Sequence, residues 1–392
     1  MDDISIDGIL PSIQLDKNGK APLYQQLAAS FRVLAEKDRL QPHQKLPPIR
    51  KLAEALGVNA VTIVNAYKLL ESGGIVYSTV GSGTYIAENN HTKPAEKVIL
   101  NDNPQMHPET YENIAATINF ARSAVPTEFF PADAFKTFIN QVLEQDPGAA
   151  FGYGEIQGYE ALRHAFCCCA KSVGIDVAAE NIHVTSGVQQ SVDILSKALL
   201  SPGDTVLIES PAAYGAAGAF LYRGAVVLPV PLENDGLDIS CFKTLIKEHR
   251  PKLVYLTPYF QTPTGIQTSV AKKKIILSLA EQYDFYIVEE DTQSEFCFSG
   301  DTVQPLKSMD DKNKVVYIKG ISKTLMPGLR IGWMILPETV REKVLSAKYG
   351  TDIETSGLIQ RAFHLFLESG AWIKHVSDLQ AVFYSRHLQM SS

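Results

Sequence analysis

One stretch of the chain reads Ser322-Lys323-Thr324-Leu325-Met326-Pro327-Gly328-Leu329-Arg330-Ile331-Gly332, and it follows an apolar, β-branched run at residues 315–318. A run of this kind predicts a buried strand. A lysine just beyond a strand end, among small and glycine residues, is well placed to form a Schiff base with an aldehyde. Arg330, seven residues further on, can hold a phosphate through two parallel hydrogen bonds. A lone lysine is more often a solvated surface charge, but the neighbours of Lys323 favour the chemical interpretation.

Helical and strand patterns alternate on both sides of this stretch. We expect strands at residues 182–185, 205–209, 253–257, 285–289 and 314–319, and helices at residues 160–172, 189–200 and 271–282. Strands that alternate with helices over this length predict an α/β sheet with helices on both faces. Residues 355–387 are expected to form a further long helix with an interruption near Gly370. The run Lys272-Lys273-Lys274 predicts a solvated helix face, and Cys167-Cys168-Cys169 predicts a packed one.

Length and composition limit the possible functions. The chain has 392 residues, enough for two or three domains, and 36 Lys and Arg against 43 Asp and Glu give a formal charge of −7. A protein that coats nucleic acid with its whole surface is therefore not expected. The acidic N-terminus lacks the features of a secretory signal, and no apolar run reaches the ~20 residues of a membrane helix. Five cysteines without a CxxC pair predict buried free thiols in a reducing cytoplasm, and the histidines show no metal-ligand spacing.

The first part of the chain, residues 19–88, is expected to form three helices and a hairpin. Apolar residues recur at helical spacing after Pro22, after Pro48 and from about Asn59, and Gly81-Ser82-Gly83 joins two β-rich runs. This outline is that of a winged helix-turn-helix, whose second helix enters the major groove of DNA. Nine basic residues stand against four acidic ones between residues 17 and 86, so this module is basic within an acidic chain.

Six residues of the module are candidates for DNA contact. Arg50 and Lys51 begin the second helix, where they can reach phosphates, while Asn59 and Thr62 begin the third and can reach base edges or phosphates. The remaining two, Gly81 and Gly83, shape the wing. The alternative is a helical bundle that does not bind nucleic acid. That alternative does not explain why glycines occur at both positions of the hairpin turn.

Several separated anchors carry a resemblance to a known family. They are Pro22-Leu23-Tyr24-Gln25-Gln26-Leu27, Lys45-Leu46-Pro47-Pro48-Ile49-Arg50-Lys51-Leu52-Ala53, Leu56-Gly57-Val58, Ala66-Tyr67, Leu70-Glu71 and Gly81-Ser82-Gly83-Thr84-Tyr85. Over about 70 residues they resemble the GntR-type winged helix almost end to end. That family usually has an arginine directly after the first residue of its recognition helix, where this chain has Ala60. The resemblance therefore implies weaker binding or an altered operator.

A second set of anchors surrounds the lysine stretch. They are Phe151-Gly152-Tyr153-Gly154, Gln157-Gly158-Tyr159, Thr185-Ser186-Gly187-Val188-Gln189-Gln190, Thr257-Pro258, Gln261, Pro263-Thr264-Gly265 and Glu289-Glu290-Asp291. In this order they resemble fold-type I pyridoxal-phosphate (PLP) enzymes, and most of all the aminotransferase-like domain of MocR regulators, which follows a GntR winged helix. The resemblance implies that Lys323 binds PLP as a Schiff base. It also implies that the cofactor phosphate binds at a helix N-terminus formed by Ser186, Gly187 and Val188. Ser322 and Arg330 would contribute further contacts to the phosphate.

The resemblance also marks departures at positions that face the cofactor. Glu290 stands where the family has the aspartate that pairs with the pyridine nitrogen, and Asp291 could replace it after a register shift. Thr292 replaces an aromatic residue that bonds the phenolic oxygen of PLP. Ala213 replaces the ring that stacks on the pyridine, with Tyr214 beside it as a possible substitute.

Two further departures concern a substrate. Thr262 stands where the enzymes have an asparagine before Pro-Thr-Gly. The small C-terminal subdomain, which holds the arginine for the α-carboxylate of a substrate, is expected to be mostly missing. Arg122 is a guess for a replacement cation, and a surface arginine is its more common interpretation.

Together these observations predict a multidomain chain with three parts. Residues 17–88 form an N-terminal α+β winged helix-turn-helix, residues 89–116 a linker, and residues 117–392 an α/β fold-type I PLP-dependent aminotransferase-like domain that lacks most of its C-terminal small subdomain. The expected function is a cytoplasmic transcriptional regulator that binds a double-stranded DNA operator as a homodimer, without membrane contact, and senses PLP, an amino acid or an amine. A working aminotransferase with a fused DNA-binding domain, and a cofactor-free dimeric regulator, stay open as alternatives.

Overall fold

The chain divides into two units, Met1–Pro94 and Ala95–Ser392, and each has a hydrophobic core of its own. The computed structural model describes residues 9–13, 15–16, 22–36, 40–41, 43–72, 75–79, 82–87, 125–212, 214–298 and 303–391. The expected linker at residues 89–116 lies outside these ranges, as do Gly81, Arg122 and Ala213. Within the ranges, no helix is both long enough and apolar enough to span a membrane.

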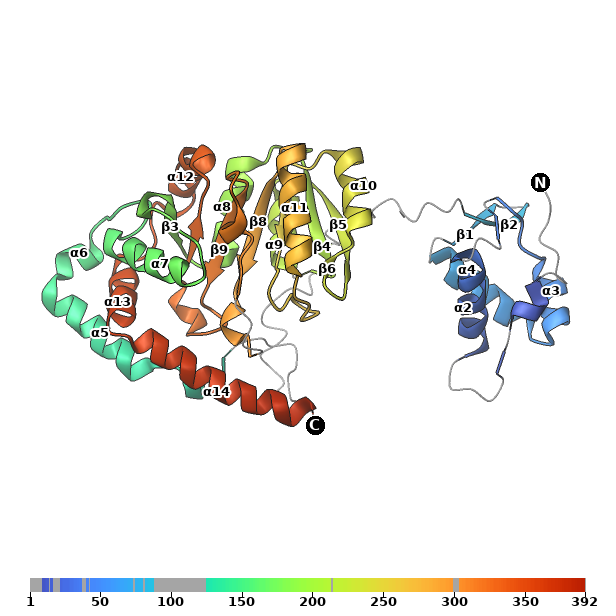
Figure 1. The fold of residues 1–392 in the computed structure, drawn as a ribbon, viewed down its shortest axis with the longest axis horizontal. Coiled ribbons are helices and arrows are strands. Elements are labelled where there is room, and N and C mark those ends of the chain that lie inside the picture. Colours follow the sequence, from blue (N-terminus) through green and yellow to red (C-terminus); the bar gives the residue numbers. More distant parts are fainter. Residues whose placement is uncertain are drawn as a thin grey trace. The chain divides into compact units, whose positions relative to one another are not determined.

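In the first unit, three helices pack together and carry a two-stranded hairpin, which confirms the winged helix-turn-helix outline (Figure 1). The helices are α2 (Leu23–Glu36), α3 (Ile49–Leu56) and α4 (Ala60–Ser72), and the strands are β1 (Val76–Thr79) and β2 (Gly83–Ile86). Phe31 and Leu52 are fully buried at the centre of the core. Ile9 and Ile13 join the same core, although both precede residue 17, where the sequence pattern places the start of the module.

The second unit is built on an eight-stranded sheet in the order β3-β10-β9-β8-β7-β4-β5-β6 (Figure 1). In chain order the strands are β3 (Ile182–Thr185), β4 (Thr205–Ser210), β5 (Val226–Glu233), β6 (Gly236–Leu237), β7 (Leu253–Leu256), β8 (Tyr286–Asp291), β9 (Val315–Gly320) and β10 (Gly332–Ile335). The strands from β9 to β5 are parallel, whereas β10 is antiparallel to both β3 and β9. The five strands expected from the sequence are confirmed to within two residues, and β5, β6 and β10 are additional.

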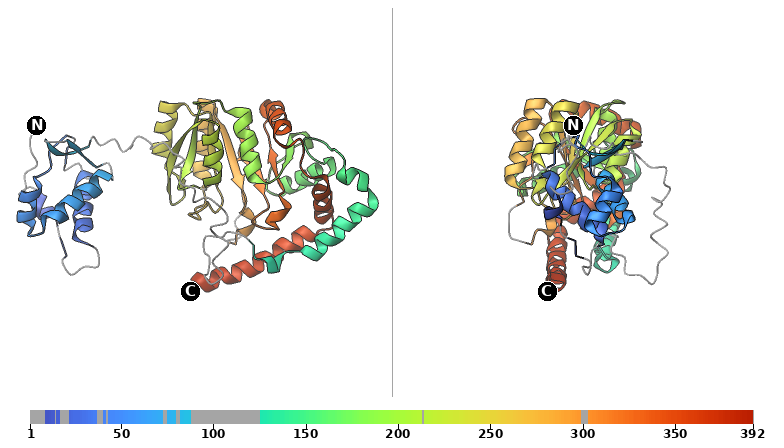
Figure 2. Two further views of the ribbon diagram at one scale, coloured as in Figure 1. Left: turned by 180° about the vertical axis from the view of Figure 1, so that it is seen from behind. Right: turned by 90° about the vertical axis from the view of Figure 1, so that its right-hand side faces the viewer.

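Helices cover both faces of this sheet, as the alternating pattern predicts (Figures 1 and 2). One face carries α8 (Val188–Leu199), α9 (Tyr214–Tyr222) and α12 (Glu338–Asp352), and the other carries α5 (Ala132–Gln145), α6 (Pro147–Phe151), α7 (Glu160–Ser172), α10 (Ile239–His249), α11 (Val270–Tyr283) and α13 (Gly357–Glu368). Side chains alternate along β9, because successive residues of a strand point to opposite faces. Val316 and Ile318 pack toward α8, whereas Tyr317 packs toward α7 and α13.

A long helix, α14 (Ala371–Ser391), follows α13 and runs along one edge of the second unit (Figures 1 and 2). The break between the two helices falls at Gly370, where the sequence predicts an interruption. Only Leu379 of this helix is fully buried, so most of its surface faces solvent. The helix is nevertheless attached to the segment that follows β8, because the Gln380 side-chain amide donates to the Glu295 carbonyl at 2.5 Å.

The lysine run of α11 is not a solvated face, and that prediction is wrong for two of its three members. Lys272 and Lys273 are buried, and only the third lysine is exposed. Lys272 Nζ pairs with the Asp235 carboxylate at 2.7 Å. Lys273 Nζ donates to the Tyr259 hydroxyl at 3.0 Å and to the Gln304 carbonyl at 2.9 Å. A buried ammonium needs such acceptors, and they come from segments that the local charge pattern of a helix does not reveal.

The cysteine run lies in α7, as expected, but it does not form one packed face. Cys168 is exposed, while Cys167 and Cys169 are half-buried. Three consecutive helical residues point in directions about 100° apart, so they cannot all face the core. All five cysteines are free thiols.

The first unit contains a buried hydrogen bond that can be tested by substitution. The Tyr67 hydroxyl on α4 donates to the Pro47 carbonyl at 2.8 Å and ties α4 to the segment before α3. We expect Tyr67→Phe to destabilise this unit by about 1–2 kcal/mol, because it leaves a buried carbonyl unpaired. Hydrogen–deuterium exchange of peptides that cover α3 and α4 measures the loss as faster exchange. Tyr77→Phe, which removes an exposed hydroxyl, is the matched control, and equal effects of the two variants would contradict the assignment.

Candidate functional site

The end of β3 and the start of α8 form a positively polarised cradle. Ser186 and Gly187 link the two elements, and Arg330 approaches them so that its Nη2 donates to the Ser186 carbonyl at 2.8 Å. Gly187 has a φ of 85°, and a Cβ at this position would lie 3.0 Å from Arg330 Nη2. A larger residue is therefore excluded on both conformational and steric grounds. The first amides of α8 have no partner within the helix, so a cation and a helix N-terminus meet where an anion can bind.

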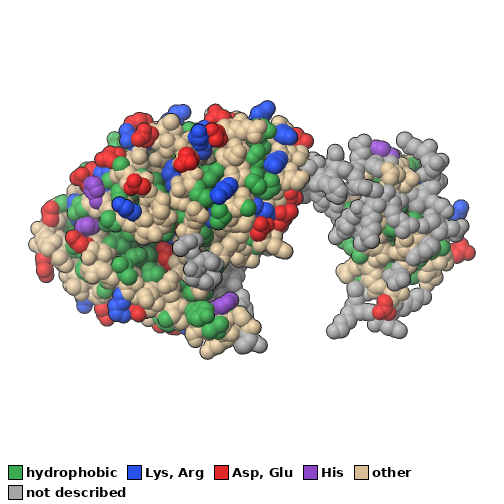
Figure 3. Space-filling model, viewed as in Figure 1, with side chains coloured by type: hydrophobic (Ala, Val, Ile, Leu, Met, Phe, Trp, Pro, Cys, Tyr) green, Lys and Arg blue, Asp and Glu red, His purple; other side chains and the backbone are tan. Residues whose placement is uncertain are grey.

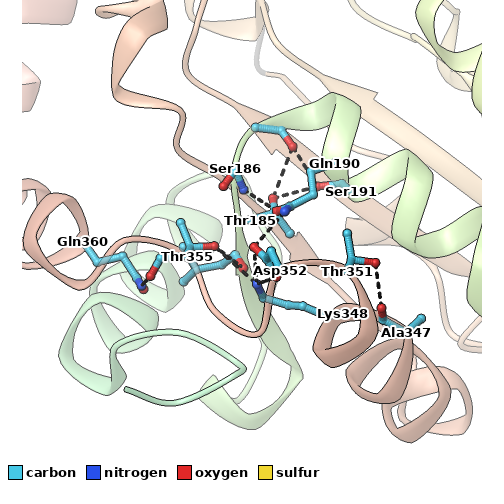
Figure 4. A network of polar contacts seen from close by, with 12 residues as sticks. Thr185, Ser186, Gln190, Ser191, Ala347, Lys348, Thr351, Asp352, Thr355 and Gln360 are labelled. Atoms are coloured by element: carbon cyan, nitrogen blue, oxygen red, sulfur yellow. Dashed lines mark hydrogen bonds and ion pairs between the residues drawn. The ribbon is translucent and has the colours of Figure 1, made fainter. Parts of the chain in front are cut away.

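A network of buried and half-buried polar side chains supports this cradle from α12 (Figure 4). The Ser186 amide donates to Gln190 Oε1 at 2.6 Å, and Gln190 Nε2 donates to Asp352 Oδ2 at 2.7 Å. Lys348 Nζ donates to both Asp352 oxygens, at 2.9 and 3.1 Å, and to the Thr355 hydroxyl at 3.3 Å. Burial lowers the pKa of Lys348, and the Asp352 carboxylate opposes that shift. Gln190, Asp352 and Lys348 had no role assigned from the sequence. The bond that joins them to the cradle, from Gln190 to Asp352, links residues 162 positions apart.

Lys323 and Glu290 lie close enough to influence each other's protonation. Lys323 is half-buried in the turn after β9, where burial lowers the pKa of its ammonium and the Glu290 charge opposes that shift. The Glu290 side chain contacts the Tyr255 hydroxyl. Burial, followed by the negative charge of Asp291, raises the pKa of Glu290 to about 7, with Lys323 opposing. A lysine and a glutamate whose pKa values shift toward one another are typical of a binding or catalytic site.

Close packing brings this pair and the cradle together. A Cβ on Gly320, at the end of β9, would lie 2.5 Å from Val188 Cγ2 and 2.9 Å from Thr292 Cγ2. Val188 is the first residue of α8, and the Thr292 hydroxyl bonds to Glu290. The structure thus gathers the cradle, the lysine turn and Glu290 around the end of one strand. Ser322 is half-buried in the same turn, next to Lys323.

Asp291 does not belong to this group, so its expected role as a substitute for Glu290 is wrong. Its Oδ2 accepts from the Tyr317 hydroxyl at 2.6 Å and from the Ser294 hydroxyl at 2.7 Å, and its Oδ1 lies 3.0 Å from Lys319 Nζ. Burial alone would raise the pKa of Asp291, but the Lys319 ammonium and these hydrogen bonds hold it below its usual value. Neighbours along a strand face opposite sides of the sheet, so Asp291 points away from Lys323.

Two of the departures from the enzyme pattern can be placed. The Thr262 hydroxyl accepts a hydrogen bond from Gln293 Nε2 at 3.1 Å, and Thr292 is buried against Gly320. Ala213 and the side chain of Tyr214 lie outside the described residues. No group of three or more His, Cys, Asp or Glu side chains in the described part of the chain could hold a metal ion.

The first unit presents its candidate DNA contacts on α3 and α4. Arg50 and Lys51 are both exposed in the first turn of α3, and Thr62 is half-buried in α4. Asn59 is exposed, but its Oδ1 accepts from the Val61 amide at 2.9 Å. Asn59 therefore caps the helix, and its NH₂ group has no described partner and can reach DNA.

Two residues on the outer face of α4 were not assigned a role from the sequence. Asn65 and Lys68 are exposed, and with Val61 they form one stripe along the helix. Their spacing of four and three residues places them on one face of a helix, and this pattern could have been recognised in the sequence. In the hairpin, Gly83 pairs with Thr79, while the other candidate wing glycine, Gly81, lies outside the described residues.

The raised pKa of Glu290 gives a pH-dependent test of the second unit. The pKa of about 7 lies above the ordinary value of 4.5, so the folded state binds the proton more tightly and loses this stability as pH rises from 4.5 to 7. Glu290→Gln cannot ionise. We expect it to match the wild type near pH 5 and to be more stable by roughly 1–3 kcal/mol near pH 8.

Urea unfolding followed by tryptophan fluorescence measures this difference, because both tryptophans of the chain, Trp333 and Trp372, lie in the second unit. Glu281→Gln, which alters an exposed carboxylate of α11, is the control. A difference between Glu290→Gln and the wild type that is the same at both pH values would contradict the assigned pKa shift.

Known proteins resemble the two units separately and together. Residues 23–86 match the family described as bacterial regulatory proteins, gntR family, and residues 116–369 match the family described as aminotransferase class I and II. The uncharacterized HTH-type transcriptional regulator YdfD of Bacillus subtilis is 29% identical over 396 residues, which cover 96% of this chain and 80% of that protein. The probable rhizopine catabolism regulatory protein MocR of Rhizobium meliloti is 27% identical over 385 residues, which cover 95% of this chain and 77% of that protein.

Solved aminotransferases share the fold of the second unit. The kynurenine aminotransferase of Pyrococcus horikoshii has 30% identity and a TM-score of 0.65, and the match covers 68% of this chain and 67% of that one. LysN, the α-aminoadipate aminotransferase of Thermus thermophilus, has 30% identity and a TM-score of 0.63 over 67% of each chain. With a GntR winged helix in front of an aminotransferase class I and II domain, and with relatives of the same two-part build, the chain belongs to the MocR-type transcriptional regulators of the GntR family.

Proposed function

We propose that this DNA-binding regulator senses PLP, or an amino compound that reacts with PLP, through the site around Lys323. One observation carries the proposal: an anion cradle made by Arg330 and the start of α8 adjoins the Lys323–Glu290 pair. PLP combines a phosphate with an aldehyde, so it matches both features. Its binding can change DNA affinity only if it favours one conformation of the regulator over another.

The described residues fit PLP at three points. Gly187 leaves room for a phosphate beside Arg330, since its missing Cβ would otherwise occupy the space near the guanidinium. PLP, when bound, supplies an aldehyde that condenses with a primary amine. Lys323 would provide that amine, and its lowered pKa raises the unprotonated fraction that acts as a nucleophile. Glu290 can hold or release a proton near neutral pH, so it can carry the negative charge that pairs with a protonated ring nitrogen.

The solved relatives support this assignment of the ligand. The structure of LysN contains N-(5'-phosphopyridoxyl)-L-leucine, and that of the Pyrococcus horikoshii enzyme contains PMP. Both are about 30% identical to this chain over the second unit. We further propose that the regulator acts as a cytoplasmic homodimer without membrane contact. The boundaries at residues 17–88, 89–116 and 117–392 stay a prediction.

A working aminotransferase is the second candidate function, and the likeness to solved aminotransferases favours it. The altered positions argue for binding without efficient turnover. Thr262 bonds to Gln293, and Thr292 packs against Gly320 and bonds to Glu290, so neither presents the side chain that the enzymes use. A third possibility, a regulator whose second unit only dimerises and holds no cofactor, makes the opposite prediction for PLP.

Absorption spectroscopy of the purified protein with added PLP tests the sensing site. We expect the wild type to gain the visible band that PLP shows when it is joined to a lysine, and Lys323→Ala to lose it. Lys197→Ala, which removes an exposed lysine of α8, is the matched control and keeps the band. A band that survives in Lys323→Ala, or that never forms, would refute the assigned site. Release of a keto acid from amino acids at useful rates would instead favour the aminotransferase.

DNA binding is tested on duplexes that the protein selects from a random library. We expect Arg50→Ala to weaken binding and to lower the slope of log affinity against log salt by about one, because one phosphate contact is lost. Lys136→Ala, an exposed position of the second unit, is the control and changes neither quantity. If Arg50→Ala binds with unchanged affinity and slope, α3 does not contact the DNA backbone as proposed.

A further inference from the structure

A cavity lies on the face of the sheet opposite to the Lys323 site. Its volume is about 950 Å³, within the range of small-molecule sites, and it is lined by α7, α13, the start of α14, β9, β10 and the turn after β8. Figure 3 shows hydrophobic side chains gathered on this face between α7 and α14. Tyr317 and Lys319 of β9 line the cavity, whereas Ile318 between them packs toward α8 on the other face. The cavity is therefore separate from the candidate PLP site.

The walls of the cavity are largely aromatic. Trp333, Phe363 and Trp372 come from β10, α13 and α14, and small or thiol side chains of α7 complete the lining. Trp333 is 5% exposed, and its Nε1 has no hydrogen-bond partner among the described residues. His364 Nδ1, in the same wall, is likewise buried and has no acceptor or donor within the described ranges. Such atoms are few in native proteins, so this wall is unusual for a surface that only packs.

The floor of the cavity carries a negative charge. Lys319 Nζ lies 3.0 Å from Asp291 Oδ1 and 2.9 Å from both Glu295 oxygens, so one ammonium is shared by two carboxylates. The Glu295 side chain is 15% exposed and remains within reach of the cavity. A further carboxylate, Glu368, stands on α13 at the lining and is mostly exposed. The electrostatic field thus favours a cation and disfavours an anion.

Cysteine chemistry does not account for the cavity. Cys168 and Cys169 both lie in its wall. Burial, followed by the neighbouring Cys168, raises the pKa of Cys169 to about 11. That thiol is protonated at neutral pH, and the thiolate is the reactive form. Burial of Cys169 therefore argues against this thiol as a nucleophile of the cavity.

We propose that this cavity binds a small apolar amine, with its hydrocarbon or aromatic body between the tryptophans and its ammonium group near Glu295. Aromatic faces attract cations, and a desolvated ammonium is stabilised when a carboxylate accepts its hydrogen bond. The site lies on the other face of the sheet from Lys323, so it does not depend on the PLP proposal.

The experiment uses the full chain without added PLP and three matched probes: phenylbutylamine, phenylbutanol and phenylbutyrate. The chain has only two tryptophans, and both line the cavity, so their emission is sensitive to a ligand bound there. We expect a saturable change of tryptophan emission with phenylbutylamine. Its affinity should exceed that of phenylbutyrate at least about ten-fold, because the floor attracts an ammonium and repels a carboxylate.

Variants locate the binding. Ala165→Phe places a ring inside the cavity and should abolish the change, whereas Ala271→Phe on the exposed side of α11 should leave it intact. Glu368→Gln, an exposed change that spares the fold, and Glu295→Gln should each weaken the amine several-fold without weakening phenylbutanol. Lys323→Ala should bind phenylbutylamine like the wild type, which separates this site from the PLP site.

Three outcomes would overturn the proposal. They are no saturable change with phenylbutylamine, a change that Ala165→Phe does not reduce, and equal affinity for phenylbutylamine and phenylbutanol. The last outcome would show an apolar cavity without preference for a cation. A fourth outcome, loss of phenylbutylamine binding in Lys323→Ala, would also overturn the proposal, because the amine would then bind at the lysine site and not in this cavity.

Discussion

The contact between the Arg330 guanidinium and the backbone at Ser186 and Gly187 holds the candidate site together. It joins the lysine stretch to a turn 144 positions earlier in the chain. The guanidinium and the start of α8 are both positive, and the Ser186 carbonyl accepts a hydrogen bond from the guanidinium. An anion at this point would interact favourably with both positive groups, so the cradle suits a phosphate. The chain of contacts from Gln190 through Asp352 to the buried Lys348 keeps the turn in place from the other side.

Three consecutive acids at the end of β8 show how one strand can serve three separate environments. Glu289 is fully buried, where burial raises its pKa to about 7 and the backbone amides of the loop after residue 303 donate to it. Glu290 turns toward Lys323, while Asp291 turns toward Lys319 on the opposite face. The alternation of a strand sends adjacent side chains to different faces. The family resemblance identified the position of these acids in the sequence. The pKa of each carboxyl group depends on its own surroundings in the folded structure.

The two candidate ligand sites lie back to back across β9, and α14 touches the surroundings of both. Trp372 at its start lines the cavity, and His375, one turn later, bonds through Nε2 to the Thr324 carbonyl at 2.8 Å. Thr324 is the residue after Lys323. The long helix thus connects the wall of the cavity to the turn that carries Lys323, although most of its surface faces solvent.

Local periodicity in the sequence predicted the helices of the first unit, the helices α7, α8 and α11, and the five expected strands, because apolar spacing follows the geometry of each element. Gly370 marked the break before α14, whereas α5, α6, α9, α10 and α12 were not predicted. The residues around Lys323 and Arg330 could locate the candidate site from the sequence, because they form one short, contiguous motif. Only the tertiary structure shows which other residues contact the candidate site and hold it in place. The burial of Lys273, the side taken by Asp291 and the cavity between α7 and α14 all depend on partners far away in the sequence, and local spacing carries no record of such partners.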